Sequence, residues 1–143
     1  MDETRLLIPF FGMLMLTMLV WIYMYIRRIG YMLKHNIPAR AGATPQKMVS
    51  VVPESVQNSA NNFNNLFQVP ILFYVIVLYL VWAGQADAIH VICAWVFFVL
   101  RAIHSAIQCT VNVVMARFVV YIVSSIALGI MIVRAVLALG STG

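Results

Sequence analysis

The chain has 143 residues, of which 64% are hydrophobic and only 9% are charged, and its formal net charge is +5. A water-soluble domain of this length could not bury so much apolar surface, so the composition excludes a soluble globular protein. The positive charge is concentrated in one connection between apolar segments and gives no reason to expect a nucleic-acid partner. We therefore expect one all-α domain embedded in a membrane.

Four apolar segments are long enough to cross a bilayer, which takes about 20 residues of helix. The predicted spans are residues 6–34, 54–84, 88–112 and 116–139, which together form a single transmembrane domain over residues 1–143. Short polar connections at Gln85–Asp87 and around Asn112 make the neighbouring helices antiparallel. The sequence thus predicts an integral membrane four-helix bundle.

The connection between the first two spans contains several helix-breaking residues, and Asn36–Val52 is expected to be an exposed loop. The second helix is expected to begin at Glu54, because a preceding proline suits a helix start. Pro70 lies inside this second helix and lacks an N–H group, so it should kink the helix and leave a backbone carbonyl free for another partner.

The distribution of basic residues predicts the orientation of the chain. The uncharged part of the first span ends at Ile26, and the following stretch Arg27–Pro53 holds five of them, Arg27, Arg28, Lys34, Arg40 and Lys47. Arg101 and Arg117 flank the third connection, whereas the opposite side is mostly acidic. The positive-inside rule then places both connections in the cytoplasm and both termini outside it.

A polar stripe on the third span is the main indication of function. Its residues follow each other at steps of three and four, which puts them on one face of a helix: Arg101, His104, Ser105, Gln108 and Asn112. The second and fourth spans carry comparable stripes, namely Asn58, Asn61, Asn65 and Gln68, and Arg117, Tyr121 and Ser124. Ionisable groups in a membrane helix normally face a cavity or a partner, although amides also join helices together. A basic, amide-rich pocket suits a carboxylate or phosphate ligand.

These residues resemble a known family. The run from Arg101 to Ser105, followed by Arg117 and Tyr121, is similar to the third-to-fourth helix signature of the MAPEG family, the membrane-associated proteins of eicosanoid and glutathione metabolism. That family includes microsomal glutathione transferases and prostaglandin E synthase. The segment Asn61–Pro70 resembles the second helix of its bacterial members.

The resemblance implies a homotrimer in the bacterial inner membrane that binds glutathione between neighbouring subunits near the cytoplasmic face. Arg117 matches the arginine that stabilises the glutathione thiolate, and Tyr121 matches a tyrosine beside the thiol. The implied binding residues are Arg101, His104, Ser105, Gln108, Asn61, Asn65 and Gln68. Lipophilic electrophiles would reach such a site from the membrane lipids.

The sequence departs from the eukaryotic pattern at two places. The acid of the Arg-Asn-x-x-Glu pattern is absent, since the nearest equivalents are Asn64, Asn65 and Gln68, and Gln108 stands where a tyrosine is expected. Two functions therefore remain open. One is a glutathione or related thiol transferase with peroxidase-like character. The other is a non-catalytic membrane protein that binds a lipid or cofactor headgroup, or an accessory subunit of a larger complex.

Other conspicuous residues are expected to have structural roles. His90 is expected at the surface near the outer start of the third helix, and Arg134 is expected to extend towards the membrane interface. Cys93 and Cys109 suggest neither a disulfide nor a metal site, and no metal is expected.

Overall fold

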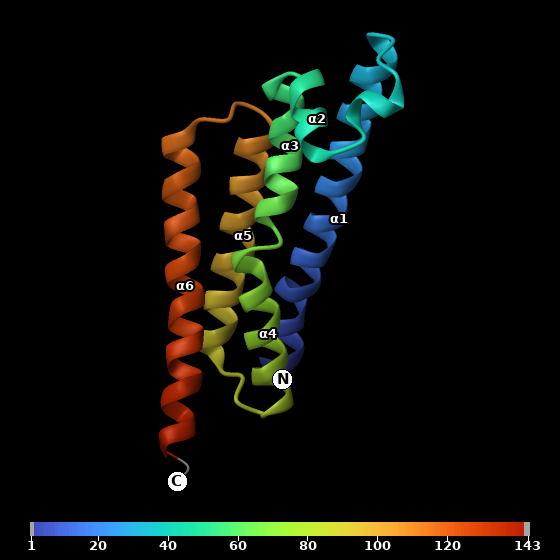
Figure 1. Cartoon of the computed structure of the whole chain (residues 1–143). Coiled ribbons are helices and arrows are strands. Elements are labelled where there is room, and N and C mark those ends of the chain that lie inside the picture. The colour runs from blue at the N-terminus through green and yellow to red at the C-terminus, as the bar shows by residue number, and fades with distance from the viewer. Residues whose placement is uncertain (1, 142–143) are drawn as a thin grey trace.

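Six α-helices and one short 3-10 helix account for nearly all of residues 2–141, the part of the chain that the computed structural model describes (Figure 1). In chain order they are α1 (Asp2–Lys34), η1 (Ala39–Gly42), α2 (Pro45–Val51), α3 (Glu54–Asn65), α4 (Val69–Trp82), α5 (Ala88–Cys109) and α6 (Val114–Ser141). No strand occurs within residues 2–141.

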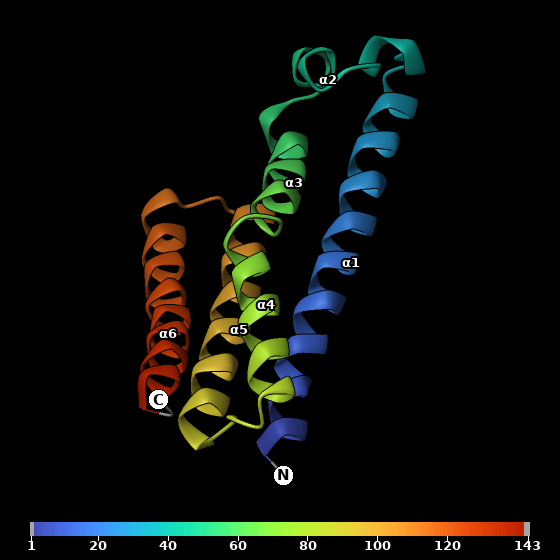
Figure 2. The ribbon, with the colours of Figure 1, turned by 60° about the horizontal axis from the view of Figure 1, so that its bottom comes forward.

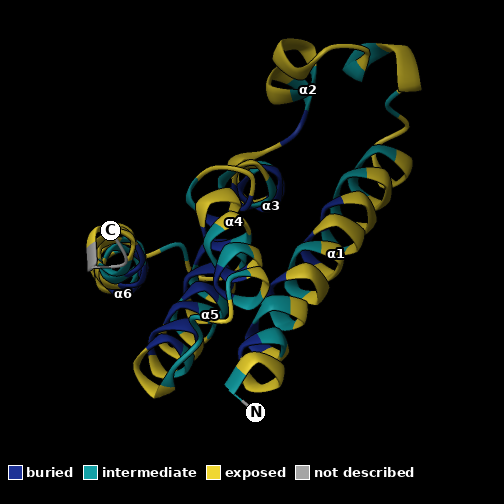
Figure 3. Cartoon of the chain, turned by 90° about the horizontal axis from the view of Figure 1, so that it is seen from below, coloured by how far each residue is buried: buried dark blue, intermediate teal, exposed yellow. Residues whose placement is uncertain are grey.

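Four helical segments are long and apolar enough to cross a membrane: Asp2–Lys34, Glu54–Trp82, Ala88–Cys109 and Val114–Gly140. They form a bundle in which α1 and α6 lie on opposite sides of α4 and α5 (Figures 1 and 2). The expectation of an all-helical membrane bundle is thereby confirmed. The outer faces of the helices are exposed, as the yellow parts of the ribbon in Figure 3 show. Many of the exposed side chains are large and apolar and suit contact with lipid.

The second span is interrupted, and its two halves are α3 and α4. We expected one helix kinked at Pro70, but the helix stops at Asn65 and resumes at Val69, with Pro70 in the first turn of α4. Gln68 has non-helical backbone angles, φ −100° and ψ −105°. Because proline has no N–H and restricts the residue before it, a helix start is the position where it costs least.

Both termini lie at one end of the bundle, and the α1–α3 and α5–α6 connections lie at the other (Figure 1). The α1–α3 connection is not the simple loop that we expected, because it contains η1 and α2. The Thr44 side chain accepts a hydrogen bond from the Lys47 N–H at 3.3 Å and so caps α2, and Pro45 occupies its first turn.

The apolar core lies where α1, α4, α5 and α6 meet. Phe73 of α4 stacks on Phe97 of α5 with ring centroids 4.5 Å apart, and both side chains are fully buried. Leu6, Met13 and Met131 fill the space around them. This core holds α5 at the centre of the bundle, with its polar residues directed towards α3 and α6.

A polar cluster of Asp87, His90 and Arg134 lies at the end of the bundle that holds the termini. Asp87 accepts a hydrogen bond from the His90 N–H at 2.9 Å, which caps α5, and its carboxylate also pairs with Arg134 of α6. Partial burial raises the pKa of the Asp87 carboxyl, but the His90 hydrogen bond and the charges of His90 and Arg134 outweigh it, so this pKa lies below its usual value.

One expectation is corrected at this cluster. His90 is not a surface residue: it is only 4% exposed, and its Nδ1 atom lies 2.9 Å from Asp87 Oδ1. Arg134 extends to the α4–α5 connection outside the spans, where its guanidinium pairs with Asp87. Asp87, in the α4–α5 connection, contacts both side chains.

Candidate functional site

The polar face predicted for the third span is buried against the other helices. Arg101, His104, Ser105 and Gln108 of α5 are between 0% and 6% exposed. Asn112 does not continue this face, because α5 ends at Cys109 and Asn112 lies in the connection to α6 with a left-handed φ of 49°. Asparagine tolerates this backbone conformation better than most residues.

Arg101 is the centre of the site. Its Nη2 atom donates to the backbone oxygen of Asn65 at 3.2 Å and to Asn65 Oδ1 at 2.5 Å. The guanidinium carbon lies 5.3 Å from the centroid of the Tyr121 ring and 6.0 Å from that of Phe97. Nε and Nη1 are buried and have no hydrogen-bond partner among residues 2–141. A buried cation with free donors is costly unless an anion pairs with it.

The interruption of the second span makes the backbone carbonyl of Asn65 available to Arg101. In a continuous helix the Asn65 carbonyl would accept from the N–H of Val69, four residues later. Here it accepts from the Gln68 N–H at 3.2 Å and from Arg101. The missing N–H of Pro70 would have bonded the carbonyl of Leu66, so the Asn65 carbonyl is made available by the break in the helix and not by the proline itself.

His104 joins α5 to the start of α6. Its Nδ1 atom lies 3.0 Å from the Arg117 carbonyl oxygen, and because a carbonyl only accepts, this nitrogen carries a proton. Its Nε2 atom lies 3.2 Å from Gln108 Oε1. The His104 and Tyr121 rings face each other with centroids 5.9 Å apart. Both nitrogens of His104 are thus engaged within the protein, and the ring positions the backbone of Arg117.

Arg117 is held at the edge of the cluster. Its Nη1 atom donates to Asn112 Oδ1 at 2.6 Å, and the side chain is half-buried. The left-handed turn at Asn112 directs this amide back towards the first turn of α6. The structure thus brings Arg101, His104, Tyr121 and Arg117 together through a short series of contacts.

Asn62 belongs to the site although the sequence stripe did not include it. It is fully buried, accepts from the Ser105 hydroxyl at 3.2 Å and donates to Cys109 Sγ at 3.4 Å. The inward side of α3 carries Asn58, Asn62 and Asn65, which also follow at steps of four and three. Because asparagines occur in adjacent pairs at 61–62 and 64–65, spacing alone did not distinguish the two possible stripes.

Asn61 and Gln68 are exposed, and the chain does not bring them to Arg101. Asn61 accepts from Gln57 at 3.3 Å, and Gln57 accepts in turn from Arg28 Nη2 at 3.2 Å. Arg28, Gln57 and Asn61 line a separate hollow of about 600 Å³ between α1, the α1–α3 connection and α3.

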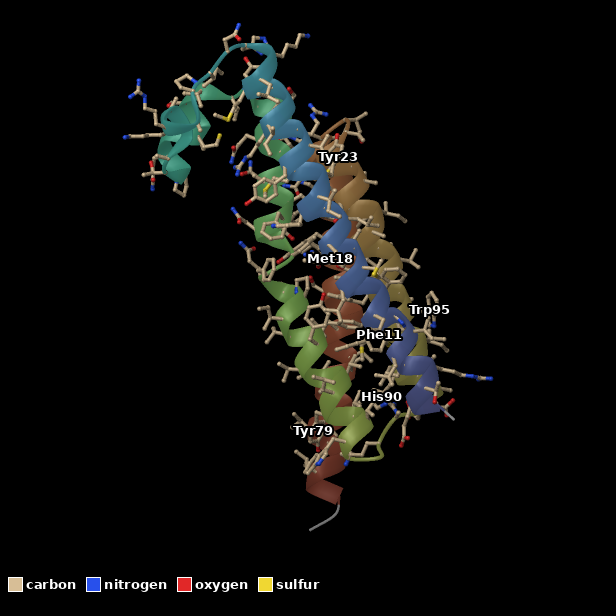
Figure 4. The ribbon with its side chains drawn as sticks, turned by 90° about the vertical axis from the view of Figure 1, so that its right-hand side faces the viewer. Phe11, Met18, Tyr23, Tyr79, His90 and Trp95 are labelled. Atoms are coloured by element: carbon tan, nitrogen blue, oxygen red, sulfur yellow. The ribbon has the colours of Figure 1, made fainter. Side chains whose placement is uncertain are left out.

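A smaller hollow of about 290 Å³ lies between α1 and α5. Apolar atoms form most of its wall, with Ser105, Cys109 and Tyr23 at its polar end. Figure 4 shows Tyr23 on the face of α1 that lies beside α5, where its hydroxyl approaches the Cys109 carbonyl oxygen at 3.4 Å. Ser105 therefore lies both at this apolar recess and in contact with Asn62 of the arginine cluster, by which we mean Arg101, Arg117 and the polar side chains around them. Residues 2–141 contain no group of three or more His, Cys, Asp or Glu side chains placed to hold a metal ion.

Comparison with known proteins gives one match. The model of the MAPEG family matches residues 6–137, which is nearly the whole chain. No match was found among curated proteins or among solved structures.

Proposed function

The chain belongs to the MAPEG family, and from this premise we propose that it is a membrane-bound glutathione transferase with peroxidase-like character that acts on lipophilic electrophiles. Family membership supports a glutathione-transferase-like or related function in general terms. The specific activity, the use of glutathione as thiol substrate and the residue roles are our proposal.

The observation that carries this proposal is the pair of unpartnered donors on buried Arg101. A carboxylate of glutathione would accept from Nε and Nη1, and such a charge-assisted pair is among the strongest hydrogen-bonded interactions in proteins. The Tyr121 ring, in cation–π contact, and the Asn65 acceptors hold the guanidinium in one orientation. Ser105, Gln108 and His104 then complete a polar wall on the same side of α5.

In this proposal Arg117 and Tyr121 act on the sulfur. A guanidinium beside a thiol favours the thiolate, which is the nucleophile. The thiolate forms a bond to the electrophilic atom of the substrate, and the electron pair leaves with the displaced group or moves into a conjugated acceptor. The thiol proton passes to water. The recess between α1 and α5 offers an apolar path from the lipid for the second substrate.

We propose that the protein assembles as a homotrimer in the bacterial inner membrane, with Asn61 and Gln68 facing a neighbouring subunit. Exposed amides within a span are unfavourable against lipid and suit contacts between helices. Native mass spectrometry in mild detergent tests the assembly, and we expect trimers. A dominant monomer in several detergents would contradict this part of the proposal.

The test of function uses the protein in lipid nanodiscs. We expect glutathione to bind by calorimetry and to react with a chlorodinitrobenzene at a rate proportional to protein. Arg101→Gln should weaken glutathione binding by at least about tenfold, since it removes a charged partner. Arg40→Gln, at an exposed arginine of η1, should leave binding unchanged. If the wild-type protein binds no glutathione at millimolar concentration, the transferase proposal fails and the non-catalytic headgroup-binding function becomes the better one.

A further inference from the structure

The arginine cluster has no acidic side chain to balance it. The whole chain contains four carboxylate side chains, Asp2, Glu3, Glu54 and Asp87. Asp2, Glu3 and Asp87 belong to the end of the bundle that holds the termini, whereas Arg101 and Arg117 lie towards the other end (Figure 1). A ligand at the cluster therefore meets two guanidinium groups and none of these three carboxylates.

Glu54 is the remaining carboxylate, and it lies too far out to contribute. It begins α3, whereas Asn65, which contacts Arg101, ends it. The distance between them along the helix is about three turns, or roughly 16 Å. A trimer with its axis along the membrane normal keeps each Glu54 at the same depth, so a neighbouring subunit would not bring this carboxylate to Arg101 either.

The neutral oxygens of the cluster are also in use. The side-chain oxygens of Asn62, Asn65 and Asn112 accept from Ser105, Arg101 and Arg117, respectively. Gln108 Oε1 faces the ring of His104. An incoming ammonium group would need oxygen acceptors, and three of these four amides, Asn62, Asn65 and Asn112, already direct their oxygens at donors of the protein.

We propose that this site recognises a thiol ligand only by its anionic groups and makes no use of a ligand ammonium. The inference rests on the proposed function and narrows its substrate class to anionic thiols, including those whose amino group is absent or acylated. The physical reason is that an ammonium entering the cluster loses hydration, gains no carboxylate and is repelled by the two arginines. A carboxylate entering the same place gains two free donors on Arg101.

Calorimetry with the wild-type protein in nanodiscs tests this specificity. The probes are glutathione and its desamino analogue, glutaryl-cysteinyl-glycine, which keeps both carboxylates and the thiol. We expect the desamino analogue to bind as tightly as glutathione or more tightly. A site that pairs the ammonium with a carboxylate would lose at least about tenfold in affinity for the analogue. A loss of more than about threefold would therefore overturn the inference.

The binding of the two thiols distinguishes a failure of this inference from a failure of the proposed function. If glutathione binds and the desamino analogue does not, the proposed function stands and the inference about the ammonium is wrong. If neither thiol binds, the proposed function itself fails and the inference fails with it.

A variant pair provides a second measurement. Asn65→Asp places a carboxylate beside Arg101, and it should reverse the preference by favouring glutathione over the desamino analogue. Asn64→Asp adds the same charge one residue earlier at an exposed position, so it should keep the wild-type preference. A reversal in both variants would indicate a general charge effect and contradict the assignment to this site. If Asn65→Asp does not fold, the comparison of the two thiols on the wild-type protein still decides the inference.

Discussion

Arg101 of α5 donates from a single nitrogen to both the backbone carbonyl and the side-chain oxygen of Asn65, the residue at which α3 ends. This contact relates the interruption of the second membrane span directly to the buried cation of the site. The carbonyl is available at the helix break, and the guanidinium that uses it is fully buried.

We expect Asn65→Ala to lower the free energy of unfolding by about 1–3 kcal/mol, since it removes an acceptor from a buried charged donor. Thermal or denaturant unfolding in one detergent measures this difference. Asn64→Ala, at the adjacent exposed position, should change stability by less than about 0.5 kcal/mol. Equal losses in the two variants would show that the contact with Arg101 does not stabilise the fold.

We expect Arg117→Ala to reduce the thiolate absorbance of bound glutathione near neutral pH by about tenfold or more. This corresponds to at least one pKa unit of the bound thiol, or about 1.4 kcal/mol. Ultraviolet difference spectroscopy at saturating glutathione provides the measurement. Arg134→Ala is the control, because Arg134 pairs with Asp87 at the opposite end of the bundle. An unchanged thiolate signal in Arg117→Ala would remove this residue from the proposed chemistry.

The Asp87–Arg134 pair should make stability depend on pH. The pKa of Asp87 in the folded protein lies below its usual value of about 3.9. The charged Asp87 carboxylate therefore stabilises the fold at pH values above its usual pKa. This contribution is lost as the pH falls through the pKa of the folded state.

Asp87→Asn isolates this effect, because asparagine can still cap α5. The melting temperature of the variant should lie below that of the wild type at neutral pH, and the gap should close below about pH 4. Asp2→Asn removes an exposed pair with Arg5 and should show little effect at any pH. A gap for Asp87→Asn that stays constant down to about pH 3 would argue against the ion pair.

The orientation in the membrane can be tested with single cysteines in a background of Cys93→Ala and Cys109→Ser. We expect Gln46→Cys on α2 to resist an impermeant maleimide in spheroplasts and Glu3→Cys to react, because the basic α1–α3 connection should be cytoplasmic. Both positions are exposed, so accessibility reports the side of the membrane. Reaction of Gln46→Cys from outside would reverse the proposed topology.

Much of the architecture follows from local properties of the sequence. The apolar length of each span and the spacing of polar residues on α5 depend only on the helix period and on the cost of exposing polar groups to lipid. These rules placed Arg101, His104, Ser105 and Gln108 on one face, and all four are buried. The same spacing, extended towards the start of α5, reaches His90, which is also buried. Applied to the whole helix, the pattern would therefore have predicted a buried His90.

The amino-acid sequence by itself determined the membrane class, the family resemblance and the polar face of the third span, because each is a property of one segment and its helical period. Only the tertiary structure decided which asparagines of the second span reach Arg101. The interruption before Pro70 sets the register of α3, and packing against α5 selects Asn62 and Asn65 while Asn61 and Gln68 remain exposed. Whether a buried donor finds an acceptor depends on the neighbouring helix, and that information lies in the packing rather than in the spacing of residues along one helix.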